Sequence, residues 1–135
     1  MNKNHVSNLE LSKKMKKLGF EQNGSFIWDE SYNPPWLRYF PNGKGYREEE
    51  CVSAFTVAEL GEMLPSNIKV RAIANGEHGG IYYLYTNKLT DYADNNFSCF
   101  YAMNNGQTKL LIENSNTEAD ARAKMLIYLM ENELL

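Results

Sequence analysis

The sequence predicts a single α+β domain in which an antiparallel sheet of five to seven strands is packed by a C-terminal helix and two shorter helices. Three observations support this fold class. The last nineteen residues have helical periodicity, an Asn-Gly pair joins two alternating runs into a hairpin, and several short strand-like runs occur with helical segments only at intervals. The 135 residues are enough for one domain, 1–135, of which residues 1–6 are expected to be disordered.

The C-terminal helix is predicted over residues 117–135. Thr117 followed three residues later by Asp120 resembles a capping box, and an acidic first turn suits the positive end of the helix dipole. Apolar residues recur at helical spacing and fill most of the circumference over the two middle turns. A helix this apolar is expected to lie against a sheet or between other elements.

Two shorter helices are predicted upstream. Ser7-Asn8-Leu9-Glu10 has capping-box spacing, and Gly19 stands where the C-cap glycine of the first helix is expected. Thr56-Val57-Ala58-Glu59 is a second capping box, and Pro65 ends the helix that follows it.

Strands are predicted around these helices. Short runs at 24–29, 36–40 and 51–55 lie between the first two helices, and runs at 68–74 and 81–86 follow the second. The strongest local signal is the hairpin of 97–104 and 107–113 around Asn105-Gly106, the preferred pair for a two-residue type I′ turn. That register places Met103 opposite Thr108, Tyr101 opposite Leu110 and Cys99 opposite Ile112. It also pairs Ala102 with Lys109, Phe100 with Leu111 and Ser98 with Glu113 on the other face.

Charge is unevenly distributed along the chain. The net charge is −3, but residues 1–20 hold five lysines against one glutamate, a net of +4, so the remainder sums to −7. An acidic chain argues against general nucleic-acid binding, which depends on neutralising phosphates. The lysine cluster of Lys13, Lys14, Lys16 and Lys17 is the exception, and its simplest interpretation is a solvated helix face. No apolar run is long enough to span a membrane, and the N-terminus lacks a secretory signal.

Catalytic and metal-binding motifs are scarce. His5 and His78 do not stand at metal-ligand spacing from a Cys, Asp or Glu, so no metal site and no cofactor are predicted. Cys51 and Cys99 are interpreted as reduced thiols of a cytoplasmic protein, although a disulfide between them stays open. A small enzyme with a dispersed site, such as Cys51 or Cys99 with His78, is an alternative, because catalytic sites are recognised by geometry and can escape sequence motifs.

Aromatic and arginine side chains gather around the two proline-containing turns. Trp36, Arg38, Tyr39, Tyr46 and Arg47 belong to residue types enriched at binding hot spots, and they form the candidate binding site. The competing interpretation is that alternate aromatic residues on short strands fill a small core. Among Tyr82, Tyr83 and Tyr85, at least one is expected to lie outside the main core, since strand side chains alternate.

Three segments, 8–18 (NLELSKKMKKL), 53–65 (SAFTVAELGEMLP) and 117–132 (TEADARAKMLIYLMEN), together resemble a family of small uncharacterised proteins of phages and prophages. The resemblance implies a helix–strands–helix sandwich and residence in the cytoplasm of a bacterial host. It supplies no activity and no catalytic residues, because the matching pieces are the predicted helices.

The sequence therefore favours a non-enzymatic accessory protein that binds a host or phage macromolecule, with an unidentified protein as the expected partner. Nucleic-acid binding through the lysine-rich helix is a further alternative. Symmetric self-association into a homodimer also stays open, because sheet edges and exposed aromatic residues often dimerise.

Overall fold

The computed structural model describes residues 2–40, 49–70, 79–88, 96–103 and 108–135. Its helices are a short 3-10 helix, η1 (Lys3–His5), and three α-helices, α1 (Leu9–Lys17), α2 (Val57–Met63) and α3 (Glu118–Glu131). Its strands are β1 (Phe26–Asp29), β2 (Trp36–Tyr39), β3 (Cys51–Ala54), β4 (Asn67–Val70), β5 (Gly80–Lys88), β6 (Phe97–Met103) and β7 (Thr108–Ser115).

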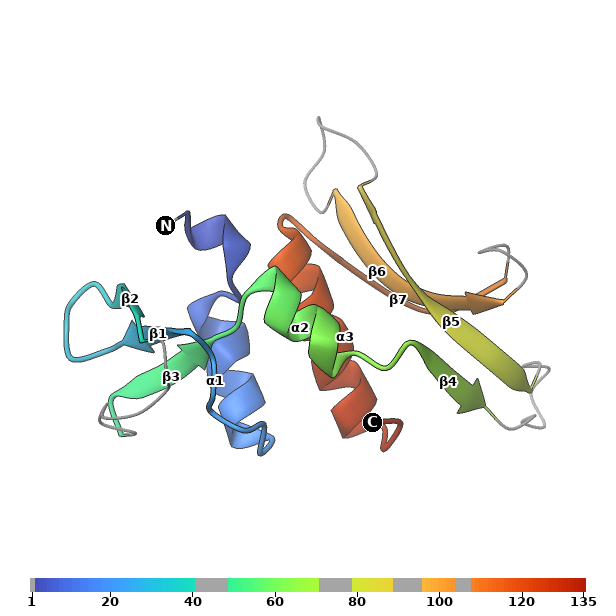
Figure 1. Ribbon diagram of the computed structural model, residues 1–135, viewed down its shortest axis with the longest axis horizontal. Coiled ribbons are helices and arrows are strands. Elements are labelled where there is room, and N and C mark those ends of the chain that lie inside the picture. Colours follow the sequence, from blue (N-terminus) through green and yellow to red (C-terminus); the bar gives the residue numbers. More distant parts are fainter. Residues whose placement is uncertain (1, 41–48, 71–78, 89–95, 104–107) are drawn as a thin grey trace.

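The α+β class and the packing of the C-terminal helix on a sheet are confirmed. The strands are divided over two antiparallel sheets, of order β2-β1-β3 and β4-β5-β6-β7, where the sequence suggested one. Figure 1 shows α3 near the middle of the molecule, between the β4–β7 sheet and the half of the chain that holds α1 and β1–β3. The two sheets stay separate because α1, α2 and α3 fill the space between them.

Helix α3 is buried on two sides, which explains its nearly uniform apolar circumference. It packs against β6 and β7 on one side and contacts α1 and α2 elsewhere. Residues from Ala119 to Leu129 recur in the main core beside Tyr82, Cys99 and Tyr101 of the sheet. A helix that contacts a sheet and two helices needs apolar residues on most of its surface.

The helix ends follow the sequence closely, with two corrections. The capping box of α2 is complete, because Thr56 Oγ1 accepts from Glu59 N at 3.1 Å and Glu59 Oε1 accepts from Thr56 N at 2.9 Å. For α1 the N-cap is Asn8, one residue beyond the prediction, since Asn8 Oδ1 accepts from Leu11 N. Ser7 is used elsewhere, because its hydroxyl accepts a hydrogen bond from Phe55 N.

The start of α3 is only half of a capping box. Thr117 Oγ1 accepts from Asp120 N at 3.1 Å, as expected. The Asp120 carboxylate does not return to Thr117 but accepts two hydrogen bonds from Asn8, from the backbone N at 2.8 Å and from Nδ2 at 3.1 Å. Asp120 therefore joins the N-termini of α3 and α1.

The C-terminus of α1 follows the predicted glycine signal. Gly19 has a φ of +95°, its N–H bonds to Lys16 O, and Phe20 N bonds to Met15 O. These two bonds define a Schellman motif, and Met15 and Phe20 belong to the same core cluster. The motif turns the chain back toward α3.

The hairpin of β6 and β7 forms, but its register changes along the strands. Met103 pairs with Thr108 and Ala102 with Lys109, as predicted. A bulge then shifts the register, so that Tyr101 pairs with Leu111, Phe100 with Ile112, Cys99 with Glu113 and Ser98 with Asn114. The bulge allows the consecutive residues Leu110 and Leu111 both to pack against the core, which strict alternation does not permit. The Asn105-Gly106 turn lies outside the described residues.

The N-terminal segment 2–6, part of the stretch 1–6 for which disorder is expected, holds η1 and one buried apolar residue. Val6 forms an isolated bridge with Thr56 and is buried beside Trp28, Val52 and Ala54. One apolar side chain in the second core cluster anchors the segment, a tertiary contact without a local sequence signal.

Candidate functional site

Strand β2 forms one edge of the three-stranded sheet and carries the described part of the candidate binding site. Trp36 is 54% exposed and Tyr39 is 63% exposed, so the core-filling interpretation is wrong for both rings. Trp28, on the neighbouring strand, is buried and donates from Nε1 to Ser7 O at 2.9 Å. Tyr46 and Arg47 lie outside the described residues.

The three described candidates do not point the same way. Successive strand residues face opposite sides of a sheet, so Trp36 and Arg38 share one face while Tyr39 lies on the other. Trp36 stacks on Tyr32, with ring centroids 4.1 Å apart and an interplanar angle of 3°. Tyr39 contacts Phe26, with centroids 5.1 Å apart. The exposed rings therefore flank the strand instead of forming one flat patch.

Arg38 forms an ion pair within the molecule. Its Nη1 lies 2.9 Å from Asp29 Oδ2, and the same carboxylate accepts from Ser31 N at 3.0 Å and from Ser31 Oγ at 2.5 Å. The Ser31 hydroxyl, followed by the Arg38 guanidinium, lowers the pKa of Asp29 below its usual value. Arg38 is thereby oriented along the exposed face of β2.

The backbone of β2 also has a defined orientation. Phe40 N bonds to Ser25 O at 2.7 Å, in the register that pairs Ile27 with Arg38. In an antiparallel ladder, hydrogen-bonded pairs alternate with non-bonded pairs. The N–H and C=O groups of Leu37 and Tyr39 therefore point away from β1, toward the outer edge. Among the described strands, none pairs with that edge.

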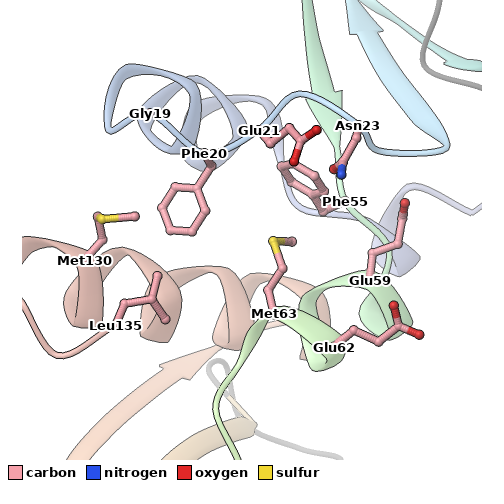
Figure 2. Close-up of a pocket in the computed structure, with 10 residues that line it drawn as sticks. All are labelled: Gly19, Phe20, Glu21, Asn23, Phe55, Glu59, Glu62, Met63, Met130 and Leu135. Atoms are coloured by element: carbon pink, nitrogen blue, oxygen red, sulfur yellow. The ribbon is translucent and has the colours of Figure 1, made fainter.

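A hollow lies where the α1–β1 connection, α2 and the end of α3 meet (Figure 2). It has a volume of about 580 Å³ and is lined by apolar side chains, including Phe20, Phe55, Met63 and Met130, together with three glutamates. Sequence reasoning missed it, because its residues come from segments far apart in the chain. A carboxylate-rimmed apolar hollow has no local motif.

The cysteine residues of the alternative enzyme hypothesis are separated. Cys51 is in β3 and Cys99 in β6, both are buried, and both are free thiols. Burial raises the pKa of Cys51 above its usual value and raises that of Cys99 to about 12. Deprotonation, which a nucleophilic thiol needs, is therefore opposed at both sites. His78 lies outside the described residues, and the part of the chain that the structure describes holds no cluster of three metal-ligating side chains.

Three of the four lysines of α1 contact other parts of the molecule. Lys13 forms an ion pair with Glu30, Lys14 Nζ lies 2.9 Å from Glu131 Oε1, and Lys16 Nζ donates to Cys51 O at 3.1 Å. Phosphate binding would have to compete with these interactions. The predicted solvated helix face thus describes these side chains only in part.

A further apolar surface lies on the outer face of the β4–β7 sheet. Tyr82 is buried in the core, whereas Tyr83 is 51% exposed beside Ile81, as side-chain alternation predicted for this strand. Ile112, on the same outer face, is 48% exposed. The side chains of Tyr83 and Ile112 are thus about as exposed as the rings on β2, so substitutions of these two residues are a matched control for substitutions of those rings.

Comparison of the chain with protein-family models, with curated proteins and with solved structures gives no match. The resemblance to phage and prophage proteins therefore stays a prediction from the sequence. Within the described part of the chain, no helix combines the length and the apolar character needed to cross a membrane.

Proposed function

We propose that this protein acts without catalysis, by binding an extended segment of another protein along the outer edge of β2. The observation that carries the proposal is the edge itself. It presents outward-pointing backbone groups at Leu37 and Tyr39, and the same strand carries two exposed aromatic side chains, those of Trp36 and Tyr39, one on each face. An added strand would gain main-chain hydrogen bonds from the edge and side-chain contacts from the rings.

The exposure of Trp36 and Tyr39 determines how much these rings can contribute to the free energy of binding. An exposed Trp or Tyr contributes little to folding but is the residue type that contributes most when it is covered by a partner. Asp29 holds Arg38 on the same face as Trp36, so the position of the Arg38 side chain is set before a partner binds. The cytoplasm of a bacterial host, and a host or phage protein as partner, are expectations that rest on the sequence resemblance alone.

The test is affinity capture from bacterial lysate with nuclease treatment, comparing wild type with Trp36→Ala/Tyr39→Ala. The double variant should lose a protein that the wild type retains, while its melting temperature changes by no more than about 4 °C, because both rings are largely exposed. Tyr83→Ala/Ile112→Ala removes similarly exposed side chains from the other sheet and should retain that protein. Equal capture by all three proteins contradicts the proposal.

A backbone variant tests the strand-addition geometry separately. Tyr39→Pro removes an N–H that points away from β1, so the existing ladder is kept. If a strand pairs with this edge, Tyr39→Pro should weaken capture more than Tyr39→Ala does. Equal effects would assign the binding to the ring alone and remove the strand-addition model.

A further inference from the structure

The hollow in Figure 2 combines an apolar lining with an acidic margin. The side chains of Phe20, Met63 and Met130 turn toward one space from three different elements. Its volume of about 580 Å³ lies within the range of small-molecule sites in proteins. Thioether and aromatic side chains are polarizable and adapt to ligands of different shape.

The position of Phe20 in this hollow is fixed by the backbone. Helix α1 is terminated by Gly19, which has a left-handed conformation. The hydrogen bond from Phe20 N to Met15 O then holds the Phe20 side chain over the end of α3. On the opposite side, Met63 occupies the last turn of α2, a helix whose start is fixed by its capping box. The apolar surfaces are therefore preorganised.

The margin of the hollow carries three carboxylates, those of Glu21, Glu59 and Glu62. The carboxylate of Glu59 is occupied by hydrogen bonds within the protein, because it accepts from Thr56 N, Ser25 N and Ser25 Oγ. Glu21 and Glu62 have no ion pair among the described residues. Among the described residues that line the hollow, none is a lysine or an arginine.

We propose that the hollow binds a small organic monocation in which an ammonium group is carried on an apolar stem. The stem would lie on Met63 and Met130, and the ammonium group would lie toward the margin to which Glu21, Glu59 and Glu62 contribute carboxylates. The ring of Phe20 adds a second source of attraction, because aromatic rings attract cations placed over their faces. This site is independent of the β2 edge and does not rest on the proposed protein-binding function.

The experiment is a titration of the full chain with hexylammonium, followed by NMR of methionine ε-methyl groups. The signals of Met63 in α2 and Met130 in α3 should shift, whereas that of Met103 at the end of β6, which does not line the hollow, should not. Hexanol matches the stem without the charge, and hexyl sulfate reverses the charge. Hexylammonium should bind roughly tenfold more tightly than hexanol, and hexyl sulfate more weakly than either.

Charge variants locate the effect. Glu21→Gln/Glu62→Gln keeps the size of both exposed side chains and should reduce the preference for hexylammonium over hexanol to about twofold or less. Glu10→Gln removes an exposed carboxylate of α1 that does not line the hollow and should leave the preference unchanged. Equal affinity of the wild type for hexylammonium and hexanol, or no shift at Met63 and Met130, overturns the proposal.

Discussion

Asp120 is expected to be the polar residue whose loss destabilises the fold most clearly. The residue is 9% exposed, and its carboxylate accepts two hydrogen bonds from Asn8, a residue 112 positions away. Hydrogen bonds to a charged group contribute about 1.5 kcal/mol or more each, so Asp120→Ala should lower the free energy of unfolding by about 3 kcal/mol. Loss of an acidic residue from the first turn of α3 acts in the same direction.

Urea denaturation measures this effect, with an unchanged m-value showing that the surface exposed on unfolding stays the same. Glu118→Gln removes a charge from the same helical turn without touching Asn8 and should cost less than about 1 kcal/mol. A double-mutant cycle of Asn8→Ala with Asp120→Ala should give a coupling of at least about 1 kcal/mol. Additive effects, or a loss below about 0.5 kcal/mol for Asp120→Ala, would show that this link between α1 and α3 does not stabilise the fold.

Two further predictions concern the end of α3 and the core thiol. Glu133 has a φ of +56° directly after α3, where Leu134 N bonds to Leu129 O, so Glu133→Gly should raise the free energy of unfolding by about 1 kcal/mol in urea denaturation. A loss of stability would contradict this. The pKa of Cys99 is raised by burial from 9.0 to about 12, so its contribution is complete below pH 9 and is lost as the pH rises toward 12. The free energy of unfolding, measured at pH 8, 9.5 and 10.5, should therefore decline less with rising pH in Cys99→Ala than in the wild type. The difference should be up to about 1.4 kcal/mol per pH unit. Parallel declines in both proteins would refute it.

The fold was most predictable where the signal is local. The capping box of Thr56 and Glu59 and the left-handed Gly19 depend on residues within one helical turn, and both form as the sequence indicates. The N-cap of α1 was misplaced by one residue because Ser7 is drawn into a hydrogen bond with Phe55, 48 positions away. A local sequence pattern does not show which of two neighbouring polar residues is the N-cap when a distant backbone group forms a hydrogen bond with one of them.

The division into two sheets had no local signal. Alternation predicts that a segment is a strand but does not say which strand lies beside it. Here β3 and β4 are consecutive in the chain but lie in different sheets, because α2 runs between them and packs on α3. The bulge at Leu110 also depends on the core, since it serves the contact of Leu110 and Leu111 with that core.

The candidate sites differ in how far sequence could find them. Residue type alone selected Trp36 and Tyr39, but whether a short strand is central or at an edge decides their exposure, and sequence does not give that. The acidic hollow is less visible still, because Glu21, Met63 and Met130 meet only after three helix ends converge.

That convergence follows from the way the helices end. Both α1 and α3 finish with the hydrogen bonds of a Schellman motif, in which a left-handed residue, Gly19 or Glu133, reverses the chain. Each reversal is followed by an apolar residue, Phe20 or Leu134, that packs against the core. A straight continuation of either helix would carry these side chains away from the core. The position of Phe20 in the lining of the hollow thus depends on the left-handed conformation of Gly19, whereas the reversal at Glu133 places Leu134 against the core.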